Sequence, residues 1–537
     1  MRPIPRRIHI SGLLFAGAGL AATALPLAGP AAGAPPISRV SLTPIGTYHS
    51  GDFDESAAEI VAFDPGTHRL FVVNANDGVV DVLDLSDPTE PTKVDELVAS
   101  GGINSVAVRD GLVAVAVQGD PAQEPGTVEL FTATGESVGD PISVGALPDM
   151  LTFTPDGSRI VVANEGEPDG YCDGGVDPEG SISIIDVATH AVSTADFKAF
   201  NDQEEALRVA GVRIFGPDAT VAEDLEPEYV AIDADSATAW VSLQENNAFA
   251  IVDLASARVT DIVPLGYKDH SLADNGLDAS NKDDEINIRP WPVSGMYQPD
   301  AIDAYSHGDS TYLVTANEGD ARDYECYSEE ARIGDLGLDP DAFPDADDLQ
   351  RNDALGRLNT TTAFPTTDPA TELYAYGARS FSIRDADGAL VFDSGDDFER
   401  ITAAALPADF NSNNDENGSF DARSDDKGPE PEGIEIGNAY GKTYAFIGLE
   451  RVGGIMVYDI TTPHNPRFVQ YVNNRDFDEP ATLADGTSNP AAGDLGPEGL
   501  TFISAEDSPT GHPLLAVGNE VSGTTTVYRL DGPGRPR

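Results

Sequence analysis

Acidic side chains recur along this chain at two kinds of position. The first kind opens a short apolar run, in most cases directly after a proline, and comprises Glu59, Asp149, Glu228, Asp300, Glu432 and Glu498, with Asn104 at the corresponding place. The second kind lies in the turn after the next run, as in the Asn-Glu-Gly sequences, and comprises Glu165, Glu245, Glu318, Glu450 and Glu520.

Carboxylates that crowd together repel one another and take up protons unless a cation neutralises them. Oxygen ligands with few His or Cys nearby suit calcium or magnesium better than zinc. We therefore expect a cation site, with calcium as the candidate ion and ligands among Asp149, Glu165, Glu228, Asp300, Glu318, Glu432, Glu450, Glu498 and Glu520. The alternative interpretation is that Pro-acid pairs and Asn-Glu-Gly sequences only build turns.

A second candidate calcium site is the Asn- and Asp-rich stretch from Asn413 to Asp421. Side-chain oxygens at its first, third, fifth and ninth places belong to Asn413, Asp415, Asn417 and Asp421, and glycine is sixth. This spacing resembles a calcium-binding loop, although Ser424 stands at the twelfth place instead of glutamate. The alternative is a polar turn.

Basic residues are scarce, with 31 Lys and Arg against 92 Asp and Glu. Candidate anion-binding residues are Arg322, Arg379, Arg423 and Lys427, because guanidinium and ammonium groups fit phosphate or carboxylate. Together with a metal-bound water as nucleophile, they would make a metal-dependent phosphoesterase. The alternative is that they pair with surplus acids. The sequence has no Gly-x-Ser-x-Gly, no His-Glu-x-x-His and no phosphate-cradling Gly-x-x-x-x-Gly-Lys-Ser/Thr motif.

The elements that must position these residues recur as units of four short β-rich runs. Seven such units begin near residues 59, 104, 149, 228, 300, 432 and 498, and the last has no fourth run. The run from Val40 to Tyr48 precedes the first unit and is expected to supply the missing strand. The pattern predicts an all-β fold, a seven-bladed β-propeller closed by an N-terminal strand, with six or eight blades as alternatives. Long acidic insertions interrupt it at 201–226, 270–298, 323–371 and 408–430.

Length and charge narrow the function classes. The 537 residues carry a formal net charge of −61, which disfavours nucleic acid and anionic membranes as partners. Residues 1–34 read as a signal peptide, with an arginine-containing start, an apolar stretch and Ala32-Gly33-Ala34 before the expected cut. Residues 35–537 are then one secreted propeller domain. We expect no membrane span, a monomer, and an unidentified small-molecule, protein or glycan ligand.

The two cysteines, Cys172 and Cys326, both follow Asn-Glu-Gly turns. Equivalent turns in a ring of repeats lie on one face, so the two residues are placed to pair, and an even count in an exported chain favours one disulfide. Two free thiols are the alternative.

Several longer motifs resemble those of a known family. They are Ala163-Asn164-Glu165-Gly166, the run from Ala316 to Asp323, the run from Ser419 to Gly433 with its Lys-Gly-Pro-Glu-Pro-Glu-Gly, and Gly496-Pro497-Glu498-Gly499. The chain thereby resembles the choice-of-anchor I family, which is similar to the mesenchyme-specific cell-surface glycoproteins. The resemblance implies an extracellular propeller-like domain, and alkaline-phosphatase or phytase-like labels on some relatives imply the phosphoesterase alternative. We expect a secreted, calcium-binding module for binding or scaffolding.

Overall fold

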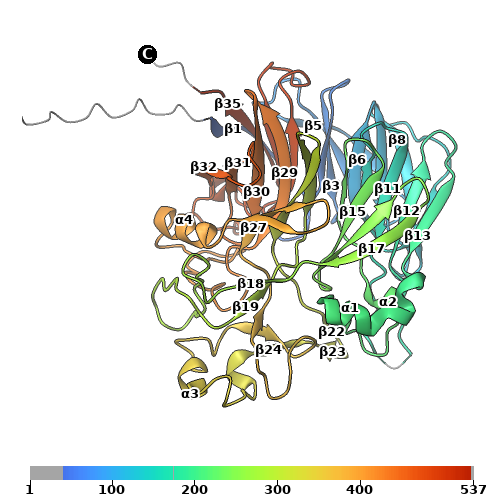
Figure 1. Ribbon diagram of the computed structural model, residues 1–537. Coiled ribbons are helices and arrows are strands. Elements are labelled where there is room, and N and C mark those ends of the chain that lie inside the picture. The colour runs from blue at the N-terminus through green and yellow to red at the C-terminus, as the bar shows by residue number, and fades with distance from the viewer. Residues whose placement is uncertain (1–39, 173, 534–537) are drawn as a thin grey trace, which may run out of the picture. The chain divides into compact units, whose positions relative to one another are not determined.

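The computed structural model describes residues 40–172 and 174–533, so the predicted signal peptide lies outside the described residues. Strands dominate, and the prediction of an all-β chain is confirmed (Figure 1). Within the described ranges the strands include seven four-stranded sheets, all antiparallel. The first four sheets follow chain order and consist of β2 (Val61–Asp64), β3 (Arg69–Asn74), β4 (Val79–Asp84) and β5 (Thr92–Val98); β6 (Ile103–Arg109), β7 (Leu112–Val117), β8 (Pro125–Thr132) and β9 (Ile142–Ala146); β10 (Pro148–Phe153), β11 (Arg159–Asn164), β12 (Ser181–Asp186) and β13 (Val192–Asp196); and β14 (Val230–Ile232), β15 (Thr238–Leu243), β16 (Ala248–Asp253) and β17 (Arg258–Pro264).

The fifth sheet is interrupted by an insertion, and the seventh combines both ends of the described chain. These sheets consist of β20 (Ile302–His307), β21 (Ser310–Asn317), β27 (Ser380–Asp385) and β28 (Leu390–Asp393); β29 (Pro431–Ala439), β30 (Lys442–Leu449), β31 (Ile455–Asp459) and β32 (Arg467–Val472); and β33 (Pro497–Ile503), β34 (Leu514–Asn519), β35 (Thr524–Asp531) and β1 (Ser41–His49). Strand β1 pairs antiparallel with β35, from Ser41 opposite Asp531 to His49 opposite Thr524.

The first strands of the sheets, here called the inner strands, form a closed ring. Each of β2, β6, β10, β14, β20, β29 and β33 contacts the next, and β33 contacts β2. Apolar cores lie between neighbouring sheets, which explains why the second strands are apolar on both faces. In β3, Phe71 and Val73 pack toward the second sheet, whereas Leu70 and Val72 pack toward the seventh.

The insertion in the fifth sheet and the segments that connect the sheets carry short strands and helices. They are β18 (Tyr267–Asp269), β19 (Ser294–Met296) and β26 (Tyr374–Ala375), the pair β22 (Asp323–Tyr324) and β23 (Tyr327–Ser328), the pair β24 (Glu330–Arg332) and β25 (Asn359–Thr361), and the helices α1 (Glu204–Ala210), α2 (Val221–Asp224), α3 (Ala346–Leu349) and α4 (Asp397–Ala405), with 3-10 turns at Lys198–Gln203, Ile333–Asp335 and Pro490–Ala492. Figure 1 shows α3, β24, β22 and β23 grouped beside one end of the sheets. Residues of the insertion and of the segment before β20 share a separate core around Trp291, Ile333, Phe343 and Leu355.

Candidate functional site

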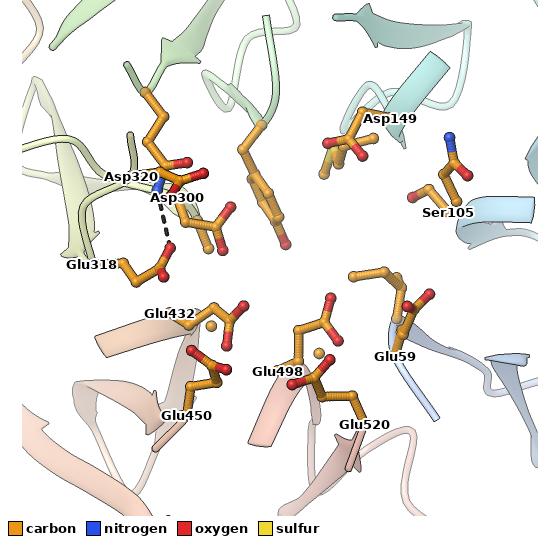
Figure 2. Close-up of a pocket in the computed structure, with 18 of the residues that line it drawn as sticks. Glu59, Ser105, Asp149, Asp300, Glu318, Asp320, Glu432, Glu450, Glu498 and Glu520 are labelled. Atoms are coloured by element: carbon orange, nitrogen blue, oxygen red, sulfur yellow. Dashed lines mark hydrogen bonds between the residues drawn. The ribbon is translucent and has the colours of Figure 1, made fainter. Parts of the chain in front are cut away.

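A cavity of about 510 Å³ lies where the inner strands begin, and residues in or directly beside the strands of all seven sheets line it. Its walls carry nine carboxylates and two basic side chains. The carboxylates are Glu59, Asp149, Asp300, Glu318, Asp320, Glu432, Glu450, Glu498 and Glu520, and the basic residues are Lys427 and Arg451. Figure 2 shows these carboxylates arranged around one opening. We call this opening the acidic mouth.

A second cavity of about 360 Å³ adjoins the first and shares Asp149, Gln244, Asp300 and Asp320 with it. Its other polar walls are Glu165, Glu167, Glu228, Glu245, Asp323 and Tyr324. Each of the nine metal ligands predicted from the sequence therefore lines at least one of these two adjoining cavities. The nine are spread over both cavities and do not surround one common ion position.

Backbone irregularities aim the inner-strand acids at the mouth. The register of the strand pair shifts directly after Pro148, Pro431 and Pro497, each of which precedes a predicted ligand. Such bulges redirect a side chain that regular pleating would point into a sheet–sheet core. The Pro-acid pairs thus build a turn and present a carboxylate at the same time.

In the Asn-Glu turns the two residues have different roles. The amide nitrogens of Asn164, Asn317 and Asn519 are buried and donate to hydroxyl groups on the third strand of their own sheet, at 3.0 Å to Ser183, 2.8 Å to Ser382 and 3.2 Å to Thr524. The glutamate that follows each asparagine lines the cavities. The asparagine therefore fixes the turn, and the glutamate is the functional member.

Gly319 shows why glycine completes one of these turns. Its φ is +94°, and a Cβ there would lie 2.0 Å from the backbone nitrogen of Gly377. The insertion thus packs directly on the turn that presents Glu318, and any larger residue would displace that glutamate.

Burial makes most of the mouth carboxyls hard to ionise. It raises the pKa of Glu59 and of Asp149 to about 7, with Glu520 adding to the effect at Glu59 and Glu167 at Asp149. The pKa values of Glu228, Asp300 and Glu498 are raised well above the usual range. Burial is the largest cause, and repulsion from neighbouring carboxylates adds to it. The metal-free mouth therefore holds protons that a cation would displace.

Part of the mouth carries its own counter-ions. Lys427 Nζ contacts the carboxylates of Glu318 and, at 3.3 Å, Glu430. Arg423 and Arg451 also contact Glu430, at 2.6 and 3.1 Å. Although burial opposes ionisation, these three cations hold the pKa of Glu430 at about 2. Two trios of carboxylates have oxygens close enough to share an ion, namely Asp300, Glu318 and Glu432, and Glu318, Glu430 and Glu450.

Two of the three arginines assigned to anions, Arg322 and Arg379, lie in buried ion pairs. Arg322 pairs with Asp224 and Glu226, and its Nη2 lies 2.9 Å from Glu226 Oε2. Arg379 pairs with Glu399 and donates to the backbone oxygens of Asp278, Ser424 and Asp426 at 2.7, 2.9 and 2.6 Å. Neither side chain lines the two described cavities of the mouth.

Arg423 and Lys427 are likewise paired with acids, as described above for Glu430. For all four basic residues, the geometry matches the alternative raised from the sequence, pairing with surplus acids.

The loop from Asn413 to Asp421 encloses a guanidinium. Arg475 donates to the backbone oxygens of Asn413 and Glu416, at 2.7 and 2.9 Å. The Asp421 carboxylate accepts instead from Ser424 Oγ at 2.5 Å. The loop backbone thus binds an arginine, and the Asp415 carboxylate accepts from Asn413 Nδ2 at 2.6 Å.

The predicted disulfide is present. Cys172 and Cys326 are bonded, with 5.2 Å between their Cα atoms, across 154 residues of chain. It joins the turn after β11 to the segment between β22 and β23, and Asp323 and Tyr324 of β22 line the second cavity. The bond therefore ties one wall of the mouth to the third sheet.

Sequence reasoning missed Glu167, Asp320, Glu430 and Arg451. Glu167 and Asp320 stand two residues after Glu165 and Glu318, within Glu-Gly-Glu and Glu-Gly-Asp. That repeated acid-Gly-acid spacing was a usable signal. Glu430 and Arg451 adjoin predicted residues, but their roles depend on contacts across the ring.

The metal-free protein is expected to gain stability as the pH falls from 8 to 5.5. Glu59 and Asp149 have folded pKa values near 7, so between about pH 4.5 and 7 the folded chain binds protons that the unfolded chain releases, and stability falls as pH rises through this window. Glu430 stays ionised throughout. Calorimetry in chelator should show a higher melting temperature at pH 5.5 than at 8, by about 1 °C per kcal/mol for a chain this long. A maximum at pH 8 would contradict this assignment.

Fold and site together define an all-β protein with a ring of sheets around an acidic mouth. The family model for the choice-of-anchor I domain matches residues 59–463. The chain belongs to the choice-of-anchor I domain family. No helix among the described residues is both long and apolar enough to cross a membrane.

Two curated relatives are similar over part of the chain. Gigasin-3a of Magallana gigas is 27% identical over 195 residues, which is 35% of this chain and 69% of that protein. The mesenchyme-specific cell surface glycoprotein of Strongylocentrotus purpuratus is 28% identical over 326 residues, which is 51% of this chain and only 41% of that protein.

Solved structures with similar architecture include β-propellers. Hydrazine synthase of Kuenenia stuttgartiensis has a TM-score of 0.46 at 14% identity, covering 90% of this chain and 99% of that one. The Cps50 (Swd1) β-propeller domain of Myceliophteria thermophila has a TM-score of 0.42 at 10% identity, covering 91% and 99%. These likenesses carry no argument about function.

Proposed function

We propose that this chain is an extracellular seven-bladed β-propeller, closed by β1, that binds calcium at its acidic mouth and serves as a binding or scaffold module. The blade count is supported by the seven four-stranded sheets and by the pairing of β1 with β35. The extracellular assignment is supported by the family, by the relative named as a cell surface glycoprotein, and by the disulfide.

One observation carries the calcium assignment. Buried oxygens of four mouth carboxylates, Oε2 of Glu228, Glu245, Glu432 and Glu498, have no hydrogen-bond partner. Unpaired buried charge is costly, and a cation is the partner that satisfies several such oxygens at once. Among the described residues that line the two cavities there is no His or Cys, so the available donors are oxygens, which calcium prefers.

Calcium is expected to stabilise the chelator-treated protein. A ligand present at 100 times its dissociation constant adds about 2.7 kcal/mol if it binds only the folded state. For a chain of this length, that is a rise in melting temperature of about 3 °C. Calorimetry with calcium should show it at pH 8, and potassium chloride at equal ionic strength is the control for screening. If the two salts change the melting temperature equally and titration calorimetry shows no heat of calcium binding, the calcium assignment is wrong.

The metal-dependent phosphoesterase remains a prediction from the sequence. The basic side chains that line the larger cavity, Lys427 and Arg451, already contact Glu318, Glu430 and Glu450. A phosphate would have to displace these carboxylates. Hydrolysis of a chromogenic phosphate ester in the presence of calcium tests this alternative, and we expect none above background.

A further inference from the structure

The acidic mouth has two electrostatically different halves. The larger cavity holds Lys427 and Arg451 among its carboxylates. The smaller cavity has eight acidic side chains and, among the described residues that line it, no basic one; the acids are Asp149, Glu165, Glu167, Glu228, Glu245, Asp300, Asp320 and Asp323. A bound metal cation would therefore meet more uncompensated carboxylates in the smaller cavity than in the larger one.

Two glutamates in the smaller cavity lack partners although they are almost completely buried. Glu228 is 8% exposed and Glu245 is 6% exposed, and Oε2 of each has no hydrogen-bond partner. The two carboxyl groups lie within hydrogen-bonding reach of each other. Two carboxyl groups at that separation cannot both be ionised unless a cation lies between them; otherwise one of them holds a proton.

The Arg322 guanidinium does not compensate them. Arg322 is fully buried and contacts Asp224 and Glu226, so one positive charge already faces two acids. Glu226 Oε1 is itself without a partner. This leaves Glu165, Glu228 and Glu245 as an uncompensated group, with Glu167 and Asp149 beside it.

The backbone around these residues is firmly held. Glu245 O accepts from Arg213 Nη1 at 2.6 Å, and the next residue, Asn246, donates its side chain to the backbone oxygens of Arg213 and Asp224 at 2.7 Å each. Glu165 N donates to Leu147 O at 2.8 Å. Ligands on a preorganised scaffold lose little entropy when an ion binds.

We propose that the smaller cavity holds one calcium ion between the carboxylates of Glu228 and Glu245. Glu165, whose oxygens do not lie within 4.8 Å of both in this structure, turns toward the ion and completes the site. This proposal rests on the proposed function and assigns the ion to one half of the mouth. In the larger cavity, Lys427 supplies a positive charge beside both trios, because its ammonium contacts Glu318, which belongs to each of them, and Glu430 of the second. The mouth then contains one resident ammonium and one exchangeable ion.

The test is titration calorimetry with calcium chloride on the chelator-treated full chain and two double variants. Glu228→Gln with Glu245→Gln removes two proposed ligands, and affinity should fall roughly 100-fold or more. Glu432→Gln with Glu498→Gln removes two equally unpartnered acids from the larger cavity and is the matched control, with affinity expected within about threefold of wild type. Because each change removes repulsion, both variants should melt in chelator no lower than wild type, which shows that they fold.

The outcomes separate this proposal from the proposed function. If wild type binds no calcium, both fail. If wild type binds and the control variant loses affinity while Glu228→Gln with Glu245→Gln keeps it, calcium lies in the larger cavity and the present proposal is overturned alone. Equal losses in both variants would also overturn the assignment to the smaller cavity.

Discussion

Replacing Arg322 with methionine is expected to destabilise the protein by about 3–5 kcal/mol. The Arg322 guanidinium is fully buried against Asp224 and Glu226, and its Nη2 also donates to the backbone oxygen of Asp224 at 2.8 Å. Methionine would fill much of the volume but leave two buried carboxyls without a cation. Burial already raises the pKa of Asp224, an effect that Arg322 opposes. Chemical denaturation measures the loss.

Two further variants show whether charge is the cause. Arg351→Met removes an arginine that pairs with Asp353 at the surface, where such pairs contribute about 0–1 kcal/mol. Adding Asp224→Asn and Glu226→Gln to Arg322→Met should restore much of the stability, because neutral buried groups cost less than unpaired charges. Unchanged stability of Arg322→Met, together with loss of phosphate binding by the wild-type protein, would instead make Arg322 the anion ligand that the sequence predicted.

Removing the disulfide is expected to have an effect of similar size. A loop of 154 residues closed by one bond corresponds to a chain-entropy stabilisation of about 5 kcal/mol, which is an upper value. Cys172→Ser with Cys326→Ser should therefore lower the melting temperature by up to about 5 °C. The variant should also bind calcium less tightly, because the bond holds the segment that carries Asp323 and Tyr324 against the smaller cavity.

The wild-type protein under reducing conditions is the control for that pair of substitutions. It should match the double serine variant in melting temperature, since both lack the bond. An oxidised wild type and a double variant with equal melting temperatures would show that the cross-link contributes nothing to stability.

Much of the architecture was predictable because each repeat has a recognisable sequence pattern over a short stretch of chain. Short apolar runs with turns between them matched strands, and the Pro-acid pairs matched the places where inner strands begin. The insertion was harder, since the core around Trp291 and Phe343 is built from residues far apart in the chain. Its two-residue strands have no periodicity for a sequence pattern to reveal.

The sequence indicated most of the acidic residues that line the mouth, but not which of them form hydrogen bonds and ion pairs. Adjacent Asn and Glu are both polar, so the sequence cannot show that Asn317 is buried while Glu318 faces a cavity. Arg475 reaches the loop at Asn413 from 62 residues away, and Arg322 reaches Asp224 from 98. Which acids already have a cation is decided by such long-range contacts, and these divide the mouth into a half that has basic side chains and a half that has none among its described lining residues.

The most direct measurement is an anomalous difference map from crystals of the mature chain, grown with a chelator and then soaked in terbium as a calcium substitute. The account predicts a peak in the smaller cavity, within coordination distance of carboxylate oxygens of Glu165, Glu228 and Glu245. It also predicts no comparable peak in the loop from Asn413 to Asp421, where Arg475 donates to the backbone oxygens of Asn413 and Glu416. Ordered water and no anomalous peak anywhere in the mouth, at saturating ion, would contradict the account.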